Sequence, residues 1–280
     1  MDSEKITNLI NETGTPFQIL CAEIANKKQY HTLSEYPFTF PPSNGPLLGQ
    51  PGTIDFLALM AKSSDPVAIM LIVECKRASD KIKHWVFPEV PSDMKDSTLF
   101  ISSCPREENG KREIIEYVEH SLKFPDLGYS TIHSSYEALT QGFEANERLN
   151  INRDTSEKIY VPLRQVNTGL KAVIHKTIGF KTIRTDELSR ILYLPVVVTT
   201  ANLYLAKFNF SDISISTGEV AKDKISYVEK DWVSYQFPLP DYLAYINGLI
   251  AKTATFIVNA NHWEEFLDKV TSVSGLVGGK

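Results

Sequence analysis

Three charged side chains interrupt or end apolar stretches that have the composition of strands. Asp55 is the lone charge in T-I-D-F-L-A-L-M-A (53–61), and Glu74 and Lys76 follow the apolar run at 67–73. Side chains alternate across a strand, so we expect Glu74 and Lys76 to share one face while the intervening cysteine points away. Because burying an unpaired carboxylate is costly, such groups usually pair or bind a metal. The spacing therefore predicts one small site that contains two carboxylates and a lysine.

Two carboxylates beside a lysine suit phosphoryl chemistry assisted by a metal ion. Such oxygen ligands favour Mg²⁺, for which Mn²⁺ can substitute, and two are enough because magnesium keeps several waters and binds phosphate oxygens. A lysine near the ion can hold or deprotonate the attacking water and offset charge on phosphorus. The alternative interpretation is that Asp55 caps or pairs locally, while Glu74 and Lys76 form a cross-strand ion pair at an exposed strand end.

Composition and turns predict the strands that would carry these residues. The run at 67–75 is continuously apolar and rich in β-branched residues, as in a central strand covered on both faces. A short K-S-S-D-P turn separates it from 53–61, so these two strands are expected to form an antiparallel hairpin. A third strand is predicted at 36–40.

A helix is predicted to begin at Thr15, ahead of these strands. Thr15 is expected to cap it, Pro16 occupies the first turn, where its missing N–H does no harm, and Gln18 completes a T-x-x-Q capping box. Glu23 falls at the edge of the apolar stripe of this helix. That stripe is predicted to be buried and to consist of Phe17, Leu20, Cys21 and Ile24.

The order of these residues resembles the PD-(D/E)xK nucleases, the restriction-endonuclease-like superfamily. The matching pattern is G-T-I-D (52–55), eighteen further residues and E-C-K (74–76), behind a helix that bears Glu23. The resemblance implies a core made of a helix, a three-stranded antiparallel meander, a second helix and a further strand. In this sequence those elements would be the helix from Thr15, the strands at 36–40, 53–61 and 67–75, a helix at 161–176 and a strand at 191–200.

The same resemblance implies roles for individual residues. Asp55 and Glu74 would be ligands of Mg²⁺, or of Mn²⁺ in its place, and Lys76 would be the base that positions the water. Glu23 would be the helix carboxylate that some family members add to the metal shell. The chain departs from the pattern at Pro51, which is not adjacent to Asp55, so the literal P-D pair is absent.

Basic residues gather in two places, although the chain has a net charge of −5. Between Lys158 and Arg190 there are seven basic residues against two acidic ones, and a second group follows the E-C-K motif. Phosphate binding requires such local positive charge, whereas a solvated helix face is the alternative for each residue. The predicted nucleic-acid-binding residues are Arg77, Lys81, Lys83, Arg164, Lys171 and Lys176.

The rest of the chain is predicted to alternate between helices and strands. In the helix at 161–176, Gly169 weakens the prediction because glycine disfavours helix interiors. The additional helices are predicted at 106–122, 135–143, 241–251 and 262–270. The additional strands are predicted at 203–210 and 232–237.

Composition limits the class of protein. The 280 residues are 42% hydrophobic and 22% charged, which is ordinary for a soluble globular protein. No apolar run approaches the ~20 residues of a spanning helix, and the N-terminus lacks the features of a signal peptide. We therefore expect a cytoplasmic protein without membrane association. Three widely separated cysteines argue against a disulfide framework or a structural zinc site, and the six histidines show no metal-ligand spacing.

These observations predict an α/β protein with a mixed central sheet flanked by helices. A single nuclease-like domain is expected over 1–280, with a large insertion at about 78–157. The expected activity is metal-dependent hydrolysis of DNA, and the resemblance places it in restriction or phage defence. The alternatives are a ribonuclease on the same fold and a non-catalytic nucleic-acid-binding or assembly module. A homodimer is compatible with the sequence.

Overall fold

A computed structural model provides the structure of the chain. The residues that it describes are 3–39, 51–61, 67–78, 83–88, 99–108, 111–120, 131–132, 143–145, 156–177, 190–238, 245–246, 249–250 and 252–277.

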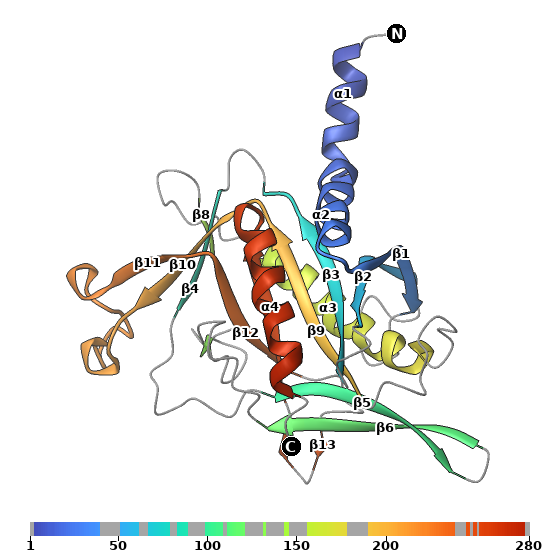
Figure 1. Cartoon of the computed structure of the whole chain (residues 1–280). Helices are drawn as coiled ribbons and strands as arrows, with labels where there is room; N and C mark the ends of the chain where they lie inside the picture. The colour runs from blue at the N-terminus through green and yellow to red at the C-terminus, as the bar shows by residue number, and fades with distance from the viewer. Residues whose placement is uncertain are drawn as a thin grey trace.

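Along these residues, two α-helices precede a run of strands, a third α-helix precedes a second run of strands, and a fourth α-helix comes last (Figure 1). The α-helices are α1 (Ser3–Glu12), α2 (Thr15–Lys27), α3 (Ser156–Thr177) and α4 (Trp263–Val277). Short 3-10 helices are η4 (Phe210–Asp212), η5 (Lys222–Lys224) and η6 (Ala260–His262). The strands of the first half are β1 (His31–Thr39), β2 (Pro51–Met60), β3 (Val67–Lys76), β4 (His84–Pro88), β5 (Leu99–Glu108), β6 (Lys111–His120), β7 (Thr131–Ile132) and β8 (Phe143–Ala145). Those of the second half are β9 (Arg190–Thr199), β10 (Asn202–Lys207), β11 (Ser226–Lys230), β12 (Trp232–Pro238), β13 (Tyr245–Ile246), β14 (Leu249–Ile250) and β15 (Lys252–Asn259).

A mixed sheet forms the centre of the molecule. Its strand order is β1-β2-β3-β9-β5-β15-β12-β7, and β6 pairs with β5. The first three strands form an antiparallel meander, whereas β9 runs parallel to β3 along the whole length of β3. The predicted α/β class with a mixed sheet is therefore confirmed, as is the hairpin of β2 and β3. A smaller sheet has the order β11-β10-β4-β8.

Two predicted helices are wrong. The segment predicted as a helix at 106–122 instead belongs to β5 and β6, which pair along their length from Glu108 with Lys111. Asn109-Gly110 between them is a strong hairpin signal, and helical spacing over so short a stretch does not outweigh it. The helix predicted at 241–251 is contradicted by β13 and β14, and that predicted at 135–143 lies almost entirely outside the described residues.

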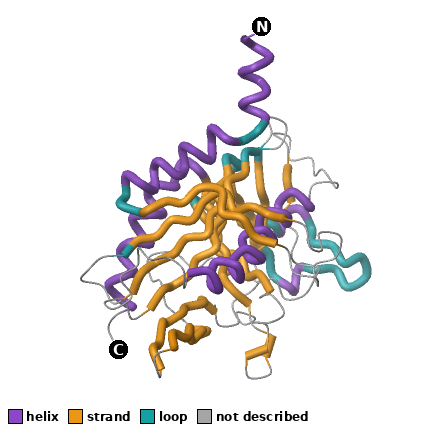
Figure 2. The backbone as a smooth tube through the Cα atoms, turned by 90° about the vertical axis from the view of Figure 1, so that its right-hand side faces the viewer, coloured by secondary structure: helices purple, strands orange, loops and turns teal. Residues whose placement is uncertain are grey.

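Helices cover both faces of the central sheet (Figure 2). On one face α3 packs through Leu163 and Val166 against side chains such as Ile72 and Tyr193. On the other face α2 and α4 pack against alternate residues of the same strands, including Val73. As the apolar run predicted, the interior of β3 is buried on both faces. Among the described helices, none is long and apolar enough to cross a membrane.

Gly169 allows α3 to approach β2 closely. A Cβ at this position would lie 2.6 Å from Cδ1 of Ile54, whose side chain is completely buried. We expect Gly169→Ala to destabilise the protein by about 1 kcal/mol, because overpacking costs about 1–3 kcal/mol and outweighs the helix propensity gained, at most about 1 kcal/mol. Urea unfolding measures this. The Gly169→Ala, Ile54→Val double variant should be less destabilised than the sum of its single variants, and a stabilised Gly169→Ala protein would contradict the prediction.

Candidate active site

The structure brings Asp55, Glu74 and Lys76 together at one open pocket. The pocket lies where β2 and β3 meet the junction of α1 and α2 on one side and α3 on the other. Gln18 of α2 and Gln165 of α3 also line it. Because β2, β3 and two helices meet at this point, residues far apart in the sequence become neighbours.

The two carboxylates sit where the ladder between β2 and β3 ends. Regular pairing runs from Met60 with Ile69 to Phe56 with Val73, so Asp55 and Glu74 would be the next pair. Instead, Oδ2 of Asp55 accepts the backbone N–H of Cys75 at 2.6 Å. The Glu74 carboxylate is in turn hydrogen-bonded to the Asp55 backbone. At this point each carboxylate bonds to the backbone of the opposite strand, where a regular ladder would have a bond between two backbone groups.

The predicted alternation along β3 is confirmed around the site. Cys75 packs against the opposite core together with Cys21 of α2, and neither cysteine is in a disulfide. Burial raises the pKa of the Cys75 thiol well above its ordinary value, which makes it a poor nucleophile. Glu74 is only 8% exposed, so the alternative of an ion pair at an exposed strand end does not describe it.

Burial and a neighbouring negative charge act on both carboxylates. Burial, followed by the charge of Asp55, raises the pKa of Glu74 well above its ordinary value, and the Asp55 backbone and Lys76 oppose this. The pKa of Asp55 is raised by burial and by the charge of Glu35, while the Cys75 N–H and Lys76 lower it. Among the described residues, Oε2 of Glu74 is buried without a hydrogen-bond partner. A divalent cation between these oxygens would satisfy the unpaired atom and offset the repulsion.

These pKa shifts predict how the cation-free protein responds to pH. A raised carboxyl pKa makes the folded state favour the protonated form, so this stability is present at low pH and lost as pH rises. In EDTA, the urea midpoint should therefore contain a component that falls above about pH 4–5, where free carboxylates titrate. The Asp55→Asn, Glu74→Gln double variant should lack this component. Glu219→Gln, an exposed control, should retain it, and identical pH profiles for all three proteins would contradict the assignment.

Two glutamines fix β2 at the pocket. Gln18 Nε2 donates to the Asp55 carbonyl oxygen at 2.6 Å, and Gln165 Nε2 donates to the Thr53 carbonyl oxygen at 2.5 Å. The predicted capping box is therefore wrong, because Gln18 bonds to β2 and the helix begins at Thr15 after Gly14, without a side-chain cap. Sequence reasoning missed both glutamines as site residues, since their partners are remote in the chain.

Glu23 is not brought to the pocket. Its side chain is exposed, and Gln18 is the α2 residue that lines the site. Five residues correspond to about 140° around a helix, so Gln18 and Glu23 point in different directions. Of the predicted stripe, Phe17, Cys21 and Ile24 pack against the core, whereas Leu20 is 54% exposed and was wrongly placed inside. The buried residues of α2 are Cys21, Ala22 and Ala25.

The predicted nucleic-acid-binding residues have different surroundings. Arg77 is exposed, but its Nη1 donates to the Asn11 carbonyl oxygen at 2.6 Å and so holds the end of α1. Arg164 lies next to Gln165 on α3 and is half-buried, and Lys83 is exposed. Lys81 lies outside the described residues, as do the side chains of Lys171 and Lys176.

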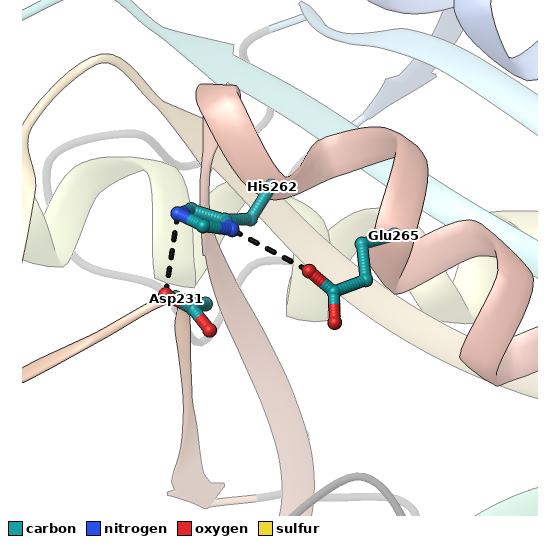
Figure 3. A group of neighbouring side chains, drawn as sticks. All are labelled: Asp231, His262 and Glu265. Carbon is teal, nitrogen blue, oxygen red and sulfur yellow. Dashed lines mark ion pairs between the residues drawn. The ribbon is translucent and has the colours of Figure 1, made fainter.

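A second polar cluster joins the turn after β11 to the start of α4 (Figure 3). Nε2 of His262 lies 3.2 Å from Oδ1 of Asp231, and Nδ1 lies 3.5 Å from Oε2 of Glu265. One ligand atom from each residue falls within 4.8 Å of the others, as in a metal site. Both ring nitrogens already face a carboxylate, however, and Asp231 and Glu265 are more than half exposed. The contacts of His262 with these two carboxylates account for the cluster.

Comparisons of the chain with protein-family models, with curated proteins and with solved structures find no match.

Proposed function

We propose that the protein is a cation-dependent nuclease that hydrolyses phosphodiester bonds, with DNA as its substrate. The observation that carries the proposal is the buried, unpartnered Oε2 of Glu74, which lies at the same pocket as Asp55 and Lys76. A buried carboxylate oxygen is costly unless it is paired, protonated or bound to a cation. Two carboxylates that need a cation, beside a lysine, fit phosphodiester hydrolysis better than they fit a purely structural ion pair.

Five residues of the pocket have roles in this proposal. Asp55 and Glu74 would hold Mg²⁺, which when bound would offset negative charge on the phosphate and make a bound water more acidic. Lys76 holds the attacking water and places positive charge beside the phosphate. Gln18 and Gln165 fix the backbone of β2, so that the Asp55 carboxylate is held in position. Hydrolysis adds water across one P–O bond, leaving phosphate on one product and a hydroxyl on the other.

The arrangement of elements supports the resemblance to PD-(D/E)xK nucleases. Along the chain, α2, the meander β1-β2-β3, α3 and the parallel strand β9 follow the order that this resemblance implies. Pro51 begins β2, four residues before Asp55, in place of a literal P-D pair. Residues from the proposed insertion add β5 and β6 to the central sheet and β4 and β8 to the smaller one. A role in restriction or phage defence rests on the resemblance alone.

Substrate contacts would come from α3 and from the segment after β3. Arg164 lies next to the pocket residue Gln165 on α3. Among the basic residues of α3 whose side chains the structure describes, it is nearest in sequence to the site. Lys171 and Lys176 continue along the same helix, and Lys81 and Lys83 follow β3. We propose that these residues bind phosphates, whereas Arg77 is engaged with α1.

A substrate panel tests the proposal and its alternatives. Plasmid, linear duplex DNA, single-stranded DNA and RNA should each be incubated with the protein in Mg²⁺ or in EDTA. We expect the protein to cleave DNA in the presence of Mg²⁺ and not in EDTA. Cleavage confined to RNA would assign a ribonuclease, and binding without cleavage of any substrate would assign the non-catalytic alternative.

A further inference from the structure

The edge strand β1 is interrupted directly opposite Asp55. The pairing of β1 with β2 joins Ser34 to Phe56 and Tyr36 to Ile54, and it omits Glu35. Glu35 has a φ of 54°, in the left-handed region that residues other than glycine rarely adopt. Regular pairing is thus interrupted at the level where β2 carries its only acidic side chain, and it resumes from Tyr36 with Ile54.

At this interruption, the regular alternation of β2 side chains between the two faces of the sheet is broken. In a regular strand, residues two apart share a face. Here Ile54 packs in the core beneath α3, whereas Phe56 packs in the core beneath α2 and α4. The irregular backbone at Glu35 and Asp55 therefore takes Asp55 out of the regular alternation, at the end of the ladder where it meets Glu74.

Glu35 is unfavourable for stability in two ways. Its backbone is in a strained conformation, and the register of β1 with β2 places it opposite Asp55, which is also acidic. Its side chain is exposed, and within the described part of the chain it makes no hydrogen bond or ion pair that would offset these effects. Strain of this kind persists mainly at functional sites, where the surrounding structure enforces it.

Glu74 provides an independent indication that a cation belongs beside Asp55. Glu74 is 8% exposed and lines the pocket, and its Oε2 has no hydrogen-bond partner in the part of the chain that the structure describes. Magnesium bound by two carboxylates keeps several waters, and these waters require hydrogen-bond acceptors. Glu35 is a third carboxylate on the opposite side of Asp55 from Glu74, as the strand order β1-β2-β3 requires.

We propose that Glu35 is a positioning residue of the active site, whose carboxylate accepts hydrogen bonds from waters of the cation held by Asp55 and Glu74. The inference rests on the proposed function. It accounts for the presence of a glutamate at this position. The backbone conformation would favour glycine, and the neighbouring carboxylate of Asp55 would favour a neutral side chain.

Two substitutions separate the backbone of Glu35 from its charge. Glu35→Gly removes both the strain and the carboxylate, and Glu35→Gln removes the charge while keeping the side-chain shape. Gln29 is a matched control, because it also has a positive φ (68°) but follows α2, away from the pocket. The measurements are the urea midpoint in EDTA and the Mn²⁺ affinity of the substrate-free protein by calorimetry.

We expect Glu35→Gly and Gln29→Gly both to raise the urea midpoint, because glycine adopts positive φ without strain. Mn²⁺ affinity should fall by about 10–100-fold in Glu35→Gly and Glu35→Gln, the range for residues that act on a metal through its ligands. It should not change in Gln29→Gly. If Glu35→Gln binds Mn²⁺ as the wild type does while Glu74→Gln does not, the Glu35 proposal is wrong and the proposed function stands. A wild-type protein that binds no Mn²⁺ would overturn both.

Discussion

Replacing Glu74 with glutamine is expected to abolish cation-dependent cleavage and to stabilise the cation-free protein. Glutamine preserves the shape of the side chain but removes one of the two charges that we propose hold Mg²⁺. We expect cleavage to fall by more than ~10²-fold, beyond the effect of changing a residue that acts only through a ligand. Stability in EDTA should rise at neutral pH, because a buried charge with an unpartnered oxygen is lost.

Asp55→Asn is the companion change. Asparagine keeps an oxygen that can accept the Cys75 N–H, so the end of the hairpin should stay intact while cation affinity is lost. Calorimetric titration with Mn²⁺ and cleavage in Mg²⁺ are the measurements, with the exposed Glu219→Gln protein as control. Unchanged Mn²⁺ affinity in Glu74→Gln or Asp55→Asn would show that these carboxylates do not bind the cation.

Lys76→Ala should separate the chemical step from cation binding. Lys76 lines the pocket but is not one of the two carboxylates proposed to hold the cation. The variant should therefore bind Mn²⁺ with near-normal affinity. Single-turnover cleavage should slow by about 10²–10⁴-fold, the range for a positioned acid–base group.

Lys76→Arg distinguishes two roles of this lysine. Arginine keeps the positive charge but is not deprotonated in proteins, so a variant that cleaves well would indicate electrostatic stabilisation, and one as slow as Lys76→Ala would indicate proton transfer. Lys207→Ala, on an exposed residue at the end of β10, is the control. Near-normal cleavage by Lys76→Ala would mean that Lys76 takes no part in the chemical step.

Local patterns predicted the part of the site that depends on strand geometry. The alternation of Glu74, Cys75 and Lys76 follows from the period of two along a strand, and the short turn before β3 predicted the antiparallel hairpin. The continuous apolar run also predicted correctly that β3 lies between two layers of helices. Each of these inferences depends on neighbours in the sequence, which is why it could be made without the structure.

Features that depend on tertiary contacts could not be predicted in this way. The Gln18 side chain bonds to Asp55, 37 positions away, where a local capping bond was expected. The face of α2 that is buried is set by its packing on β2, β3 and α4. Helical spacing placed Leu20 inside, and the family resemblance placed Glu23 at the site. The positive φ of Glu35 has no signature in sequence, because nothing local requires a glutamate to adopt it.

The most direct test of the account is to locate the cation on the protein. Fe²⁺ can replace Mg²⁺ at oxygen-rich sites, and with ascorbate and peroxide it produces hydroxyl radicals that cut the nearby backbone. Mass spectrometry of the fragments should show cuts next to Asp55 and around Glu74, which excess Mg²⁺ suppresses and Glu74→Gln eliminates. Cuts confined to the neighbourhood of Asp231 and His262, or no Mg²⁺-sensitive cuts near Asp55 and Glu74, would contradict the proposed active site.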